Sequence, residues 1–135
     1  MLAGMLLFLV RHAHAEAGDP DELRPLSLRG RDEARALAER LSSHETPPAL
    51  VLTSPLLRAR ETAEAIAERT GAELHIDERL APGATAELLR SVLPGSGAPV
   101  AAVGHQPDCS EIALELTGAD PGFPTGGVAE VALDP

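Results

Sequence analysis

The sequence predicts an α/β domain with a largely parallel sheet, and two observations support this. Short apolar runs alternate along the chain with segments of helical periodicity,. The first run, about residues 6–10, has no polar position, as expected of a central strand that is covered on both faces,. A chain of 135 residues can build one hydrophobic core but not two, so we expect a single domain over residues 1–135,.

The first half of the chain predicts two strands and two helices in alternation. A polar loop follows the first strand to about residue 27, and a second strand spans about residues 50–53. Ser54 and Pro55 then predict the N-cap and first position of a helix that ends at Thr70, with Gly71 as its C-terminal cap,. The helix between the two strands places apolar residues at i, i+3, i+4 and i+7, namely Ala34, Leu37, Ala38 and Leu41,.

The second half continues this alternation. "ELHID" predicts a third strand with Leu74 and Ile76 on one face, and "TAELLRSVL" predicts a short helix. A fourth strand, about residues 99–103, ends at Gly104. A helix from Pro107 to Gly118 follows it, and "VAEVALD" predicts the last strand.

The start of the chain, "MLAGMLLFLV", has the apolar character of a signal peptide or membrane anchor, but it lacks a basic segment and is too short to span a bilayer,. We therefore expect a core strand from about Met5, and the true start could be Met1 or Met5. The single Cys109 excludes an intrachain disulfide and favours a reducing cytoplasm,. Its place on an apolar helical face indicates a core residue.

Composition disfavours binding to nucleic acid or to an anionic membrane. All eleven basic residues are arginines, and 21 acidic residues give a formal net charge of -10,. Phe8 and Phe123 are the only aromatic residues, so platforms for base stacking are nearly absent,. An anionic substrate would have to be small or bind in a locally positive pocket.

Chemically reactive residues follow three of the predicted strands. Arg11 and His12 follow the first, Ser54 and Arg58 the second, and His105 the fourth. The carboxyl ends of parallel strands share one edge of the sheet, so we expect these residues to meet there.

Phosphoryl transfer suits this set. The guanidinium group of arginine binds two phosphoryl oxygens at once, and a neutral imidazole is a competent nucleophile toward phosphorus. A second imidazole can donate to the phosphoryl oxygens as charge builds up. A zinc site of His12, His14 and His105 is the rival interpretation. No carboxylate stands at an obvious ligand spacing and the arginines would repel a cation, so we expect no metal.

The segments "LVRHAHAE", "RPLSLRGRDEA", "TSPLLRARETAE" and "VGHQP" resemble the histidine phosphatase superfamily, and specifically its short SixA-type phosphohistidine phosphatases. The resemblance covers about residues 6–133. It implies a three-layer α/β/α sandwich with a mostly parallel central sheet and no cofactor. It also implies that His12 becomes phosphorylated and that Arg11, Arg58 and His105 form the phosphate pocket. We add Ser54, His14 and Gln106 as candidates for substrate binding.

Two departures from the family pattern bear on the substrate. Ala13 stands where the superfamily usually has glycine, and Ala81 and Pro82 stand where many relatives carry a glutamate that protonates the leaving group. Glu78 and Glu87 are poor replacements. An alkoxide needs such an acid, whereas imidazole leaves readily because the pKa of its conjugate acid is about 6.5.

The sequence therefore predicts a cytoplasmic, metal-independent phosphatase that forms a phosphohistidine intermediate. Its expected substrate is phosphohistidine on a signalling or phosphotransfer protein, and its product is inorganic phosphate. Two alternatives stay open: a phosphatase for small phosphate monoesters, and a catalytically silent module that binds phosphorylated proteins.

Overall fold

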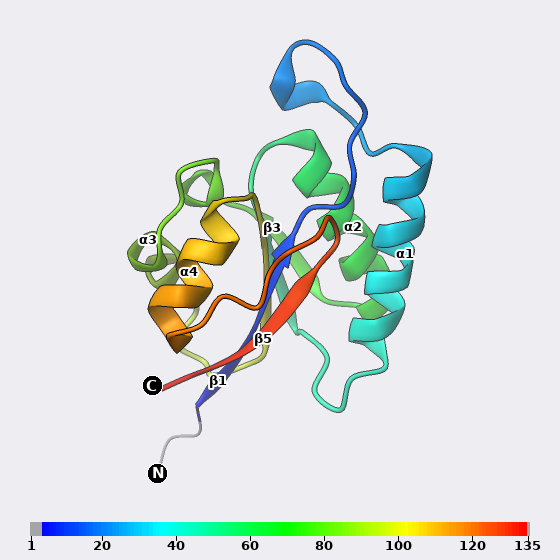
Figure 1. Ribbon diagram of the computed structural model, residues 1–135. Helices are drawn as coiled ribbons and strands as arrows, with labels where there is room; N and C mark the ends of the chain where they lie inside the picture. Colours follow the sequence, from blue (N-terminus) through cyan, green and yellow to red (C-terminus); the bar gives the residue numbers. More distant parts are fainter. Residues whose placement is uncertain (1–3, 135) are drawn as a thin grey trace.

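The computed structural model describes residues 4–134, which form a mixed five-stranded sheet between two layers of helices (Figure 1). The strand order is β3-β2-β4-β1-β5, in which β5 runs antiparallel to β1 and the other pairs are parallel. The elements are β1 (Met5–Arg11), α1 (Leu28–Ser42), β2 (Leu50–Thr53), α2 (Leu57–Thr70), β3 (Glu73–Ile76), α3 (Ala86–Val92), β4 (Val100–Gly104), α4 (Asp108–Thr117) and β5 (Val128–Leu133), with short 3-10 turns η1 (Asp21–Leu23) and η2 (Glu78–Leu80). The α/β/α sandwich is confirmed.

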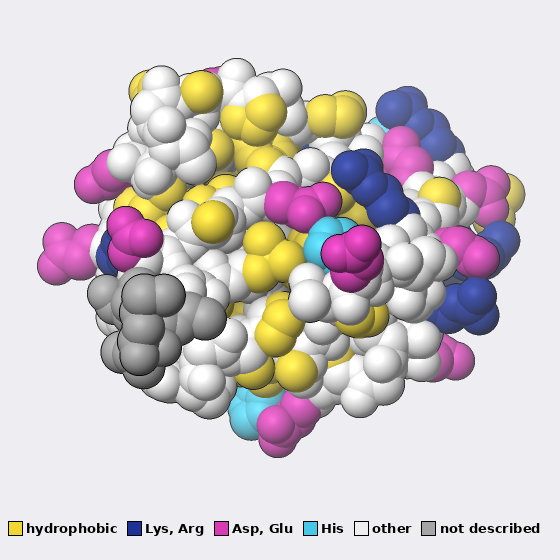
Figure 2. Space-filling view, turned by 90° about the horizontal axis from the view of Figure 1, so that it is seen from below, with side chains coloured by type: hydrophobic (Ala, Val, Ile, Leu, Met, Phe, Trp, Pro, Cys, Tyr) yellow, Lys and Arg dark blue, Asp and Glu magenta, His cyan; other side chains and the backbone are white. Residues whose placement is uncertain are grey.

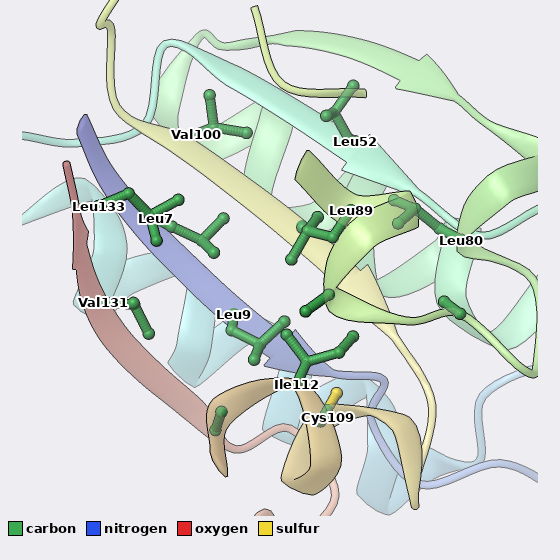
Figure 3. Close-up of a cluster of buried hydrophobic side chains, with 14 of the residues drawn as sticks. Leu7, Leu9, Leu52, Leu80, Leu89, Val100, Cys109, Ile112, Val131 and Leu133 are labelled. Carbon is green, nitrogen blue, oxygen red and sulfur yellow. The ribbon is translucent and has the colours of Figure 1, made fainter. Parts of the chain in front are cut away.

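The two faces of the sheet carry separate hydrophobic clusters because successive side chains of a strand point to opposite sides. On one face Leu7 and Leu9 of β1 pack against α3 and α4, in the cluster that Figure 3 shows. On the other face Phe8 and Val10 pack against α1 and α2. The apolar first run of the sequence is thus a strand that is covered on both sides.

Most element predictions are confirmed, including the caps Gly71 and Gly118, which both adopt a left-handed conformation,. The predicted start of α2 is wrong. The helix begins at Leu57 after the N-cap residue Leu56, which makes no side-chain cap bond. The hydroxyl of Ser54 is instead engaged by the ring of His105 and by the backbone N–H of Leu56.

The third predicted strand is confirmed as β3, but its face is only partly covered. Ile76 is 56% exposed, because β3 is an edge strand that only β2 pairs among the described residues.

Antiparallel β5 brings a turn from the far end of the chain to the end of β1. The N–H of Arg11 donates to Gly127 O at 2.9 Å, and the N–H of Gly126 donates to His12 O at 3.0 Å. Gly126 has a positive φ of 71° and lies against Glu33 of α1, so this turn favours glycine,. Residues 124–127 therefore form one wall beside the candidate nucleophile.

Figure 2 views the molecule from below Figure 1, at the end opposite the carboxyl end of β1. Acidic side chains are scattered there between apolar ones, and arginines gather toward the side of α1. No helix within residues 4–134 combines the length and apolarity needed to cross a bilayer.

Candidate active site

A cleft of about 450 Å³ opens at the carboxyl edge of the parallel strands. It is lined by Arg11, His12, His14, Ala15, Asp21, Arg24, Arg58, Pro82, His105, Gln106 and Thr125. The structure thus brings together the four residues predicted for catalysis and two of the three predicted to bind substrate. A larger groove, about 700 Å³, lies between α1 and α2 on the outer surface and contains none of these residues.

His12 is oriented for attack through Nε2. Its Nδ1 lies 2.7 Å from the carbonyl oxygen of Ala13, and since a carbonyl only accepts, Nδ1 carries the proton and Nε2 the lone pair,. The ring is 9% exposed. Burial lowers the pKa of His12 to about 4, the Ala13 carbonyl opposes this shift, and the charges of Arg58 and Arg11 add to it,. His12 is therefore neutral at pH 7.

His105 faces His12 across the cleft, with their ring centroids 5.2 Å apart. Burial, followed by the charges of His12 and Arg58, lowers the pKa of His105 to about 3,. Nε2 of His105 lies 2.8 Å from Oγ of Ser54.

Ser54 is fully buried and does not line the cleft. The expectation that it binds substrate directly is corrected, because it lies behind the ring of His105. Its hydroxyl holds that imidazole in place.

The half-buried Arg11 and the buried Arg58 both line the cleft. Arg11 Nη1 donates to Phe123 O at 2.9 Å. Arg58 Nη1 donates to Asp21 O at 2.9 Å, and its Nη2 donates to the carboxylate of Asp21 at 3.1 Å. Within the described part of the chain, Arg11 Nε, Arg58 Nε and His105 Nδ1 are buried without a hydrogen-bond partner. Two cationic groups with spare nitrogens, beside two neutral imidazoles, make a site that favours an anion.

Proton donors for a leaving group are few in this cleft. Glu78 and Glu87 do not line it, and Pro82 occupies the rim where the sequence lacks an acid. Asp21 does line it, but the hydrogen bond from Arg58 holds the pKa of this carboxyl below its ordinary value, so it is ionised at neutral pH,.

Sequence reasoning missed three polar residues of the cleft: Asp21, Arg24 and Thr125. Asp21 and Arg24 lie in a segment predicted only as a polar loop, in which Arg24 Nε donates to the Asp21 carboxylate at 3.0 Å. Thr125 reaches the cleft only through the antiparallel pairing of β5. The stretch "RPLSLRGRDEA" contains Arg24 and was the one available signal for it.

The H-x-H pair does not have the strand geometry on which the rival zinc interpretation depended. β1 ends at Arg11, so His12 and His14 do not lie on a continuing strand, and His14 Nδ1 is 2.6 Å from Ser27 Oγ. Among the described residues, no group of three or more His, Cys, Asp or Glu side chains could hold a metal ion.

Comparison with known proteins adds to this geometry. Residues 7–82 match the sequence profile of the histidine phosphatase superfamily (branch 1). The chain belongs to this superfamily. This histidine phosphatase is 30% identical to phosphohistidine phosphatase SixA of Escherichia coli (strain K12), over 96% of this chain and 86% of SixA. It is therefore a hydrolase of the SixA type.

Two solved structures share the fold of this histidine phosphatase. One is protein histidine phosphatase SixA complexed with tungstate, with a TM-score of 0.86 and 29% identity, covering 96% of this chain and 89% of the other. The other is a putative SixA of Agrobacterium tumefaciens, with a TM-score of 0.85 and 27% identity over 96% and 92%.

The departure at Ala13 is accommodated by local packing. The Ala13 side chain is fully buried in a small cluster with Leu26 and Ala34. Its backbone N–H donates to Thr62 Oγ1 at 3.0 Å. The extra methyl group thus faces the α1 side and leaves the candidate nucleophile open to the cleft.

Proposed function

We propose that this histidine phosphatase hydrolyses phosphohistidine on a signalling or phosphotransfer protein, through phosphorylated His12 and without a metal ion. The observation that carries the proposal is the hydrogen bond from His12 Nδ1 to Ala13 O, which leaves the Nε2 lone pair of a neutral ring in an arginine-lined cleft. The relationship to SixA supports the same substrate class.

In the first step, Nε2 of His12 attacks phosphorus, a new N–P bond forms, and the bond to the substrate imidazole breaks. The departing nitrogen takes a proton from solvent, which an imidazole of ordinary basicity does readily near neutral pH. Arg11 and Arg58 hold the non-bridging oxygens, and His105 stabilises the charge that builds up on them.

In the second step, water attacks phospho-His12, the N–P bond breaks, and inorganic phosphate leaves. The water proton passes to solvent or to the phosphate released. Asp21 lies beside Arg58 in the cleft and is ionised, so it cannot donate a proton. No other described group in the cleft is placed to protonate an alkoxide, and this disfavours alkyl phosphates as substrates,. His14 and Gln106 line the cleft and are proposed to contact the substrate protein.

We further propose that residues 1–135 act as one domain in the cytoplasm, where phosphohistidine proteins of signalling pathways and the reduced Cys109 would both be found.

The test compares wild type, His12→Ala and His75→Ala, each with EDTA. His75 is an exposed histidine that pairs with Glu73 outside the cleft, so its variant is the matched control. Each protein is incubated with a phosphohistidine protein and separately with an alkyl phosphate ester, and phosphate release and acid-labile label on the enzyme are followed.

We expect wild type and His75→Ala to release phosphate faster from phosphohistidine and to carry the label, and His12→Ala to do neither. Loss of release with EDTA would overturn the metal-free mechanism. Faster release from the ester would make a small monoester the substrate. No release from either would favour the phosphoprotein-binding alternative.

A further inference from the structure

Glu33 lies behind the candidate nucleophile and is not a lining residue of the cleft. Its Oε1 accepts the backbone N–H of His14 at 2.8 Å. That N–H belongs to the same peptide group as the carbonyl of Ala13, which accepts Nδ1–H of His12 at 2.7 Å. One peptide group therefore connects a carboxylate on α1 to the imidazole of His12.

The carboxylate is held in place from its other side as well. Oε2 of Glu33 accepts the hydroxyl of Thr125 at 3.0 Å and lies 3.1 Å from Nε of Arg29. The Glu33 side chain is 23% exposed. Burial opposes its ionisation, but the hydrogen bonds from His14, Thr125 and Arg29, with the charge of Arg29, together outweigh this and hold the pKa of Glu33 below its ordinary value,. Glu33 is thus an anion at neutral pH.

The peptide groups on either side of this one are also held in place. His14 O accepts the N–H of Ser27 at 3.0 Å, and a Cβ on Gly30 would lie 1.8 Å from the same oxygen. Ala13 N–H is bound by Thr62. A rigid peptide transmits a change of charge at one end as a change of hydrogen-bond strength at the other, since bonds in a chain polarise one another.

We propose that Glu33 is a positioning residue that polarises the peptide between Ala13 and His14 and so strengthens the hydrogen bond that fixes the tautomer of His12. The negative charge makes Ala13 O a better acceptor, which raises electron density on Nε2 and stabilises the ring as it becomes a phosphoimidazolium. An outer hydrogen-bond partner is known to orient an imidazole and raise its basicity when in direct contact; here the effect passes through a peptide group. This inference rests on the proposed function, because it concerns the same nucleophile.

Glu33→Gln separates charge from geometry. A glutamine carbonyl can accept the N–H of His14 while its amide donates to Thr125, so these two contacts are retained, and the charge and the exposed pairing with Arg29 are lost,. Glu33→Ala removes both. The matched control is Arg29→Ala, because the Arg29 side chain is 69% exposed and its loss leaves the bond from Glu33 to His14 intact,.

The first measurement is the pre-steady-state rate of His12 phosphorylation by quenched flow. We expect Glu33→Gln to lower the rate on the order of tenfold and Glu33→Ala on the order of a hundredfold. Arg29→Ala should stay within about twofold of wild type. Thermal unfolding of each variant shows that the comparison is made on folded protein.

The second measurement is the NMR titration of His12 in protein with no substrate. The groups that face its ring are Arg11, Arg58, Arg24 and His105, and all stay unchanged in Glu33→Gln. We expect an upfield shift of the Nδ1–H proton and a lower pKa of His12 in this variant. A wild-type rate together with a wild-type titration in Glu33→Gln would overturn the proposal. The titration needs no turnover, so it tests the role of Glu33 even if wild type does not form phospho-His12. Failure to form phospho-His12 would count against the proposed function alone.

Discussion

Burial of His12 and His105 makes the free energy of unfolding depend on pH in a defined window. Folding lowers the pKa of His12 from 6.5 to about 4 and that of His105 from 6.5 to about 3. Between pH 6.5 and these folded values, the unfolded chain binds protons that the native protein does not. Stability therefore falls as the pH falls through this window, and it is regained as the pH rises toward 7.

The magnitude follows from the two shifts. Each histidine costs about 1.4 kcal/mol per pH unit inside the window, so the pair lowers the free energy of unfolding by about 4 kcal/mol between pH 7 and pH 5. This is a large part of the roughly 5–15 kcal/mol typical of a small protein. Carboxyl groups such as Asp21 and Asp77, whose pKa values are lowered by their arginine partners, lose their contribution only at more acidic pH.

The assay is urea unfolding at pH 7, 6 and 5, in buffers without phosphate or sulfate, because an anion in the cleft would stabilise the native state. Wild type is compared with His12→Asn, His105→Asn and the double variant. We expect losses of about 4 kcal/mol for wild type, about 2 for each single variant, and less than about 1 for the double variant. An equal loss in wild type and in the double variant would refute the assignment of the pH dependence to these two rings.

Three further predictions concern residues around the site. Burial of Cys109, with the charge of Asp108, raises the pKa of its thiol to about 12. Iodoacetamide at pH 8 should therefore leave the native protein unmodified and label the protein unfolded in urea. Labelling of the native state would contradict this. Gly30→Ala should lower the free energy of unfolding in urea by about 3 kcal/mol, because its Cβ would overlap His14 O,. Gly95→Ala should be nearly neutral, because a Cβ there would meet nothing within 4 Å. Equal effects of the two substitutions would count against the packing argument. Asp108→Ala should lower the free energy of unfolding by about 2 kcal/mol, because one oxygen of Asp108 accepts two backbone N–H groups of the loop beside Pro82. Asp108→Asn keeps an acceptor oxygen and should lose less. An equal loss in the two variants would show that the charge, which both lack, matters instead.

Much of the site could be predicted because of one topological rule. Apolar runs located β1, β2 and β4, and parallel strands end at one edge, so the sequence alone predicts that Arg11, His12 and His105 meet. This reasoning needs only that these strands run parallel in one sheet.

The remaining features depend on tertiary contacts that local patterns do not encode. Nothing in "VAEVALD" indicates that β5 pairs antiparallel with β1, and so Thr125 was not expected in the cleft. Ser54 followed by proline has the pattern of a helix cap, and only the nearby ring of His105 explains its actual role. Asp21 contacts Arg58 from a loop whose path the sequence left open.

The pairing of β5 with β1 also has a consequence for synthesis. Arg11 Nη1 donates to Phe123 O, a residue 112 positions further along the chain. At ordinary translation rates a ribosome needs roughly 6 to 20 s to make that stretch. The nucleophile thus emerges early but lacks the wall formed by residues 124–127 until the last strand leaves the exit tunnel. The complete cleft therefore cannot form until residues 124–127 have been made and can reach Arg11 and His12.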